Sequence, residues 1–301
     1  QGDQGRDAIV AKRIIKDFDL TLLGPVTSVG NMYLGPFYYY FMAPFLALTY
    51  PNPVGPAVGV ALVNILTIYL LFRFTREMID EKAALISTLL YTFWAVAVEY
   101  SRFSWNPNIA PLFSLLILYG LYKVHLTGSI KWLIAIFVSA GILIQLHYVA
   151  LLMFPVIGLS LLWTLKQRRD KKFTLATVGA TLITVGMAAI PLLLFDFTHD
   201  LVILRSFNRF FVSEEEFIRP TTKLITTIKS LEGRSFLILT QLITLTKDVV
   251  LDRVMTYGVI ILTAVTGYRE LKSKKRYGVF LVLITLGVGI AGLSLLTTSV
   301  F

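Results

Sequence analysis

Long apolar stretches alternate with short charged loops along most of the chain. A helix needs about 20 apolar residues to cross the hydrocarbon core of a bilayer, and roughly eight stretches approach that length. They are Ala57–Phe72, Ala83–Tyr100, Ile109–Val124, Trp132–His147, Val149–Leu165, Leu175–Phe195, Val249–Tyr268 and Tyr277–Thr298. The pattern predicts an all-α, polytopic membrane protein with about eight transmembrane helices.

One apolar run, between Lys131 and Lys166, is too long for a single crossing. We expect it to be split near His147–Tyr148, which places Pro155 inside the second helix. Two segments near the N-terminus differ from the rest. Asp7–Phe18 has the spacing of a short amphipathic helix that lies on the membrane surface. Tyr33–Thr49 is apolar and aromatic but contains two prolines, so it either spans the membrane or lies at its interface.

The composition supports lipid as the solvent for this chain. Of its 301 residues 56% are hydrophobic and 15% charged, with a mean hydropathy of +0.73. Soluble domains contain about 25% charged residues. The absence of cysteine excludes disulfides and thiolate metal sites, and three histidines leave little room for a histidine-rich one. No sequence repeat and no nucleotide-binding motif is found.

The charged loops fall into two sets at alternate ends of the predicted helices. Residues 73–82, 123–131, 166–172 and 269–276 together hold 15 Lys/Arg and 5 Asp/Glu, while the rest of the chain holds 13 of each. The positive-inside rule therefore places the first set in the cytoplasm. Because the basic residues are spread over these loops, the net charge of +10 does not indicate a nucleic-acid partner.

This orientation divides a single transmembrane domain, residues 1–301, into four parts. Residues 1–54 form an outer segment with juxtamembrane amphipathic helices, residues 55–195 and 249–301 form membrane helices, and residues 196–248 form a long outer loop. The chain starts at Gln1 rather than Met and ends in an apolar run at Phe301. We therefore expect it to be a fragment, with at least one helix before it and more after it.

Polar residues at the outer surface are the best candidates for a site. In the opening Gly2–Ala8, the carboxylates of Asp3 and Asp7 stand four residues apart and share a face if the helix extends back to them. Such a carboxylate acts as a general base on an acceptor hydroxyl, or it simply caps the helix. Both readings remain open on these residues alone.

Four further segments have a functional and a structural interpretation. Arg102, within Glu99–Asn108, binds a phosphate or belongs to an interfacial aromatic belt. His147 is a site residue or a structural one. The run Asp196–Asp200, which contains His199 and precedes Arg205 and Arg209, binds an anionic head group or is a solvated loop with helix caps. The aromatics of Gly35–Tyr40 stack on a sugar or mark the membrane interface.

The order of these motifs resembles the lipid-dependent glycosyltransferases of the GT-C fold, and most closely the protein O-mannosyltransferase and aminoarabinose-transferase-like group. Asp3–Ala8 looks like that group's acidic motif, Gly35–Tyr40 like its juxtamembrane stretch, and Asp196–Asp200 like the polar motif after a later helix. Two departures stand out. The group commonly has Asp-Glu where this chain has Asp3-Gln4, and often has Lys before the proline where this chain has Gly35.

The resemblance implies a membrane hexosyl- or pentosyltransferase that moves a sugar from a polyprenyl-phosphate donor to a lipid, protein or glycan acceptor at the outer face of the cell membrane. It implies catalytic roles for Asp3 and Asp7. The residues that it suggests for the donor phosphate or substrate are Arg6, Arg102, His147, His199, Arg205 and Arg209. Some members use a divalent metal and others do not, so no cofactor is assigned. The alternative is a lipid-linked sugar flippase or another multi-pass transporter, whose ionisable residues favour the midplane of the membrane.

Overall fold

The computed structural model describes residues 2–27, 32–50, 52–208 and 276–300, together with residues 257 and 261. Within these residues there is no strand, and one isolated β-bridge joins Val26 to Tyr33. The chain divides into unit 1, residues 1–151 and 157–207, and unit 2, residues 152–156 and 208–301. The prediction of a single domain stays a prediction. The all-α fold class is confirmed for the described residues.

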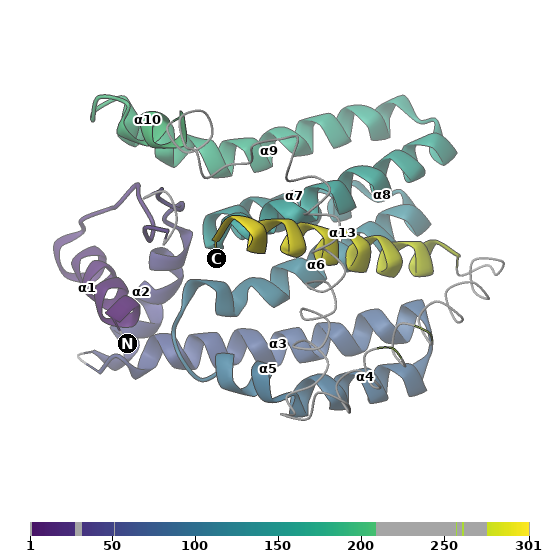
Figure 1. The fold of residues 1–301 in the computed structure, drawn as a ribbon, viewed down its shortest axis with the longest axis horizontal. Helices are drawn as coiled ribbons and strands as arrows, with labels where there is room; N and C mark the ends of the chain where they lie inside the picture. Colours follow the sequence, from purple (N-terminus) through teal and green to yellow (C-terminus); the bar gives the residue numbers. More distant parts are fainter. Residues whose placement is uncertain are drawn as a thin grey trace. The chain divides into compact units, whose positions relative to one another are not determined.

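Unit 1 holds most of the helices, and its long ones lie side by side (Figure 1). In chain order the helices are α1 (Gly2–Asp17), α2 (Phe37–Thr49), α3 (Val54–Met78), α4 (Glu81–Phe93), α5 (Ala95–Tyr100), η1 (Asn106–Ile109), α6 (Ala110–Thr127), α7 (Ile130–Leu146), η2 (Tyr148–Leu152), α8 (Met153–Arg168), α9 (Lys171–Asp196) and α10 (Val202–Asn208). Helix α13 (Arg276–Val300) belongs to unit 2.

Four helical stretches of the described residues are long and apolar enough to cross a membrane. They are Val54–Met78, Asn106–Thr127, Tyr148–Arg168 and Lys171–Asp196. Two shorter apolar helical stretches, Ile130–Leu146 and Tyr277–Gly289, accompany them. A multi-pass membrane protein is therefore confirmed, whereas the predicted number of eight spans is not.

Two predicted spans account for part of that difference. The predicted span Ala83–Tyr100 is broken at Trp94, whose backbone is extended, with ψ of 117°, between α4 and α5. Each of the two resulting helices is too short to cross a bilayer alone. The predicted span Val249–Tyr268 lies outside the described residues apart from Tyr257 and Ile261.

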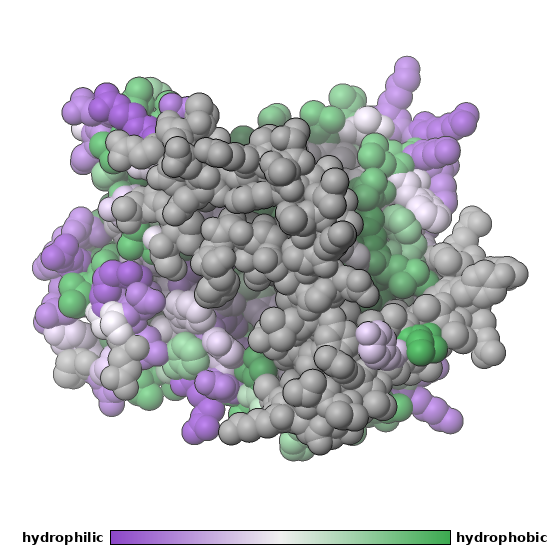
Figure 2. Space-filling view, viewed as in Figure 1, coloured by the Kyte–Doolittle hydropathy of each residue, from purple (hydrophilic) through white to green (hydrophobic). Residues whose placement is uncertain are grey.

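The helices present apolar side chains outward, as helices surrounded by lipid do. Leu62 and Ile65 of α3 and Leu182 and Val185 of α9 are all exposed. Figure 2 shows hydrophilic side chains gathered over α1, over α10 and at the loop between α8 and α9. In water this arrangement would leave large apolar areas solvated, whereas in a bilayer it costs nothing.

The loop ends of α3, α6 and α8 are closed by local capping. The Asp80 side chain accepts from the Ala83 N–H at 2.8 Å and so begins α4, and Asp170 caps α9 in the same way. Gly128 ends α6 with φ of 68°, a left-handed conformation that glycine adopts without strain. Arg168 Nη2 donates to the His125 carbonyl at 2.8 Å and ties the end of α8 to that of α6.

Two predictions about the opposite end are supported. Helix α7 ends at Leu146, with His147 as its C-cap, so the long apolar run is split where it was expected. Helix α2 has 13 residues and is thus about 20 Å long, which is too short to cross the roughly 30 Å hydrocarbon core alone. Its length favours the interfacial alternative for the segment Tyr33–Thr49.

Candidate functional site

Helix α1 lies against α2 at one end of unit 1 (Figure 1). Its apolar face buries Ala11 and Ile14, and Ile14 packs with Tyr39 and Ala43 of α2. Helix α1 ends at Asp17, and the next residue, Phe18, has a left-handed backbone conformation with φ of 52°. The helix extends back to Gly2, so the two carboxylates of the acidic motif share its first turns. This confirms the predicted amphipathic helix and makes it longer than the sequence indicated.

Arg6 joins the two carboxylates of the motif. Its Nη1 lies 3.2 Å from Asp3 Oδ1, and its Nη2 lies 3.0 Å from Asp7 Oδ1. Its Nε also donates to Asp7 Oδ1 at 3.0 Å. One guanidinium therefore holds both acids, which are in very different surroundings: the side chain of Asp3 is 58% exposed and that of Asp7 is 1% exposed.

Asp7 is a buried carboxylate that is held mainly by Arg6. Its Oδ2 is enclosed by protein atoms. Burial raises the pKa of Asp7, although the neighbouring Arg6 charge works in the opposite direction. Burial works to lower the pKa of Arg6, but Asp7 outweighs it and raises that pKa. The side chain of Tyr39 also interacts electrostatically with both groups.

Side-chain hydrogen bonds connect three distant segments beside α1 and α2. The Tyr38 and Ser104 hydroxyls lie 2.7 Å apart, and both residues are buried. Asn106 Nδ2 donates to the Leu146 carbonyl at 2.5 Å. The Tyr148 hydroxyl donates to the Tyr33 carbonyl. These bonds bring the juxtamembrane stretch, the segment around Arg102 and the turn at His147 to one end of unit 1, which we call the site end.

Gly35 stands where the resembling group often has a lysine before the proline, and its surroundings are packed closely. A Cβ atom at this position would lie 2.4 Å from Gln145 Cγ, so the local packing has no room for a side chain. Gln145 Oε1 instead accepts from the Phe37 N–H at 3.3 Å, at the start of α2. Where the group often has a lysine, this chain packs the backbone of the juxtamembrane stretch against α7.

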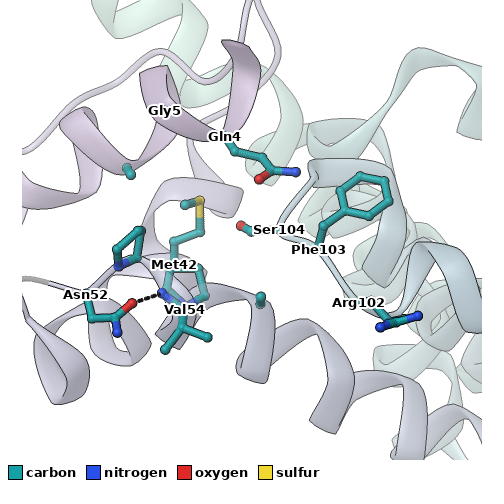
Figure 3. Close-up of a pocket in the computed structure, with 12 residues that line it drawn as sticks. Gln4, Gly5, Met42, Asn52, Val54, Arg102, Phe103 and Ser104 are labelled. Carbon is teal, nitrogen blue, oxygen red and sulfur yellow. Dashed lines mark hydrogen bonds between the residues drawn. The ribbon is translucent and has the colours of Figure 1, made fainter. Parts of the chain in front are cut away.

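A cavity of about 410 Å³ opens at the site end between α1, the start of α3 and the turn before η1. Figure 3 shows Gln4 reaching from α1 toward Phe103 and Ser104, with Arg102 beyond them. The twelve lining residues are Gln4, Gly5, Ala8, Met42, Asn52, Pro53, Val54, Pro56, Ala57, Arg102, Phe103 and Ser104. Among these residues Arg102 carries the one positive charge, and its side chain is exposed.

His147 has a structural partner at the same end. Its Nδ1 accepts from the Val149 N–H at 3.1 Å, at the start of η2. Only a neutral imidazole with the proton on Nε2 makes this bond, because a protonated ring has no acceptor. Desolvation by neighbouring groups lowers the pKa of His147, which favours the same neutral form. The bond supports the structural interpretation of this residue.

The Asp196 segment also has a structural explanation. Asp196 is buried, and its two oxygens accept from Ile203 N at 2.7 Å and Leu204 N at 2.8 Å, so it caps α10. His199 is exposed and stacks on Phe195 with ring centroids 3.8 Å apart. Arg205 is exposed on α10. Arg209 lies outside the described residues.

The described residues contain no group of three or more His, Asp or Glu side chains placed to hold a metal ion. At the acidic motif, Arg6 already pairs with both carboxylates, and Gln4 stands where the group commonly has a second acid. The described part of the site therefore does not fit a divalent metal, and no step below is assigned to one.

The comparisons with known proteins identify the family. The model described as dolichyl-phosphate-mannose-protein mannosyltransferase matches residues 34–194, more than half of the chain. The chain belongs to this family. No curated protein and no solved structure matches. The resemblance inferred from the motifs is confirmed, and the chain is a membrane glycosyltransferase of a family that uses lipid-linked sugars.

The family match covers one part of the site end and not another. It contains Arg102 and His147, and it runs from before α2 almost to the end of α9. Asp3, Arg6 and Asp7 precede the matched residues, so the match does not test them, and their assignment to an acidic motif stays a prediction. The transporter alternative is not favoured by the family match.

The sequence interpretation missed Asn52, which lines the cavity. Asn52 had a usable signal, because an Asn-Pro before an apolar run marks a helix start, and its Oδ1 accepts from Val54 N at 3.0 Å. Ser104, which also lines the cavity, and Tyr39, beside the Arg6–Asp7 pair, lie in the candidate segments Glu99–Asn108 and Gly35–Tyr40. Their individual contacts could not be predicted, since their partners are distant in the chain.

Proposed function

We propose that this family member transfers a hexose or pentose from a polyprenyl-phosphate donor to an acceptor on the extracytoplasmic side of the cell membrane. The observation that carries the proposal is the juxtaposition at the site end. A helix with an exposed carboxylate lies beside a cavity of about 410 Å³ whose lining residues include one cation. A base for the acceptor and a counter-charge for a phosphate are the two groups that the reaction requires.

Asp3 is the proposed general base. Its carboxylate is 58% exposed and so accessible to an acceptor hydroxyl or amine, unlike Asp7. As the acceptor oxygen attacks the anomeric carbon, Asp3 takes its proton, and the bond from that carbon to the phosphate oxygen breaks. The electron pair of the broken bond leaves on the phosphate, so attack from the opposite face inverts the anomeric centre.

Arg102 is the proposed counter-charge for the leaving phosphate. A guanidinium offers two parallel donors to phosphate oxygens and stabilises the negative charge that develops on them. The walls of the cavity contributed by Met42, Val54 and Phe103 are apolar, which strengthens this attraction. Exposed apolar side chains on α3 and α9 offer a surface of the kind that a polyprenyl tail contacts.

The sidedness follows from the charged loops. Residues 73–82, 123–131 and 166–172, at the ends of α3, α6 and α8, are rich in Lys and Arg, and the helices alternate in direction. The positive-inside rule puts these loops in the cytoplasm and the site end on the outer face. The acceptor is a protein, a glycolipid or another glycan.

The test supplies radiolabelled polyprenyl-phosphate sugars to the protein in sealed right-side-out and inside-out vesicles. We expect label to move to an acceptor only when donor and acceptor are both present at the outer face. Movement of donor across the bilayer without transfer would contradict the proposal and support a flippase. Transfer that occurs only at the cytoplasmic face would contradict the sidedness alone.

A further inference from the structure

The contrast between the two acids of the motif has a consequence for Arg6. Asp7 is enclosed between α1 and α2, with its side chain 1% exposed, so it offers no surface to a substrate. The guanidinium of Arg6 is engaged by carboxylates on two sides. Neither residue is therefore placed to act directly on donor or acceptor, although the sequence suggested that both do. Asp3 is different: it does not line the cavity itself, but its carboxylate is 58% exposed and it precedes Gln4, which does line it.

We propose that Arg6 and Asp7 are positioning residues, a buried pair that fixes the carboxylate of Asp3 for its work as general base. This inference rests on the proposed function and deepens it. The buried end of the pair is Asp7, which holds Arg6 through two nitrogens at 3.0 Å each. At the exposed side of the pair, Arg6 Nη1 lies 3.2 Å from Asp3 Oδ1.

The geometry gives the pair an orienting effect that a surface ion pair lacks. An exposed Asp–Arg pair three residues apart on a helix is weak, because both side chains remain free to rotate. Here Asp7 and the packing of α1 on α2 remove that freedom from the guanidinium. Asp3 then has one oxygen bound to a fixed partner and its other oxygen available to an acceptor.

Burial of the anchor indicates a functional reason for it. A buried carboxylate is unfavourable, and an apolar side chain of similar size would fill the space at less cost. The other groups that face the pair are Asp3 on α1 and the Tyr39 hydroxyl on α2, whose hydrogen bond works to lower the pKa of Asp7. Arg6 has the larger effect on Asp7.

The experiment measures kcat and donor KM per folded protein for Arg6→Gln, for Asp7→Asn and for the double variant Arg6→Gln/Asp7→Leu. The double variant removes both charges and leaves no uncompensated buried ion, so it should fold. We expect Arg6→Gln and the double variant to lose roughly 10- to 100-fold in kcat, with donor KM within about twofold of wild type. Asp7→Asn keeps Oδ1 as an acceptor for Arg6 but removes the charge that holds the guanidinium, so its kcat should fall by less than that of Arg6→Gln.

The matched control is Arg13→Gln, which removes an exposed cation from the same helix and should change neither constant. A folded double variant with wild-type kcat would overturn the proposal. So would an Arg6→Gln protein with unchanged kcat and a raised donor KM, because that result makes Arg6 a donor ligand.

A second measurement separates this inference from the proposed function. If the wild-type protein transfers no sugar, the proposed function fails, and the pair is then judged by carbodiimide labelling of Asp3 followed by mass spectrometry. Pairing with Arg6 protects the carboxylate, so we expect labelling of Asp3 to be several-fold faster in Arg6→Gln/Asp7→Leu than in wild type. An unchanged rate would show that Arg6 does not hold Asp3.

Discussion

The two ends of unit 1 use polar residues in opposite ways. At the site end, buried polar side chains such as Tyr38, Ser104 and Asn106 bond to partners that are tens of residues away in the chain. At the other end, residues 73–82, 123–131 and 166–172 carry mostly exposed charges with local caps. The charges there are the basis of the predicted orientation in the membrane, whereas hydrogen bonding at the site end joins the segments around the cavity.

An ion-pair cluster around Glu77 at the basic end illustrates this contrast. Glu77 of α3 accepts from Lys123 Nζ at 2.8 Å and from the Tyr119 hydroxyl at 2.5 Å, both on α6. Arg73 lies 3.4 Å from the same carboxylate. Every charge in this cluster has a partner within it, so it joins two helices and leaves no group available to a substrate.

Apart from loss of the proposed base itself, the largest expected effect comes from breaking the hydrogen bonds of the site end. Asn106→Leu removes the donor to the Leu146 carbonyl and leaves that buried acceptor unsatisfied, which costs roughly 1–3 kcal/mol of folding free energy. We expect transfer per folded protein to fall by roughly 100-fold, because the turn that carries Arg102 shifts relative to α1. Thermal unfolding in detergent gives the folded fraction. Wild-type transfer by folded Asn106→Leu protein would show that this hydrogen bond does not position the turn that carries Arg102.

A smaller effect is expected for the cation of the cavity. Arg102→Gln removes the proposed counter-charge, and donor KM should rise by roughly tenfold if one charged hydrogen bond of about 1.5 kcal/mol to the phosphate is lost. Arg76→Gln, an exposed cation at the basic end, is the matched control and should leave donor KM unchanged. Equal effects of the two substitutions would mean that Arg102 acts only through net charge.

Glu77→Gln should affect stability without affecting transfer. It weakens bonds to Lys123 and Tyr119 between α3 and α6, and we expect a loss of about 1–2 kcal/mol, seen as a lower Tm. Transfer per folded protein should match wild type. A specific loss of transfer in this variant would contradict the division of roles between the two ends.

The smallest effect concerns the pH dependence of stability at Asp7. Burial raises the pKa of Asp7 above that of an unfolded aspartate, so the folded state binds its proton more tightly than the unfolded state does. The stability that this group contributes is present below its unfolded pKa and lost as pH rises through its folded pKa. Asp7→Asn should therefore have a Tm equal to or above that of wild type at neutral pH, with a flatter Tm profile through that window. A steeper dependence of Tm on pH in Asp7→Asn than in wild type would contradict a raised pKa of Asp7 in the folded state.

Much of the helical architecture follows from local patterns in the sequence. The split at His147, the short helix α2 and the alternation of basic loops depend on apolar run lengths, prolines and charge, all of which are local. No proline or glycine stands next to Trp94 that would predict the helix break there. The sequence interpretation therefore overestimated that helix.

The site was less predictable than the fold. The acidic motif and Arg102 were recognised because they cluster before and after apolar runs, but their surroundings depend on tertiary packing. Nothing in the spacing of Asp3 and Asp7 distinguishes an exposed acid from a buried one, since α2 decides which face of α1 is covered. For the same reason Asp196 was a site candidate by sequence and a helix cap in the structure.

The central claim is that the exposed acid of the motif performs the chemistry at the site end. The most direct measurement compares sugar transfer by Asp3→Asn with transfer by Asp17→Asn, an exposed acid at the far end of the same helix. The account predicts that Asp3→Asn loses roughly 100- to 10,000-fold in kcat, as removal of a general base does, while Asp17→Asn keeps wild-type transfer. Wild-type transfer by folded Asp3→Asn protein would contradict the account and return Asp3 to the role of a helix cap.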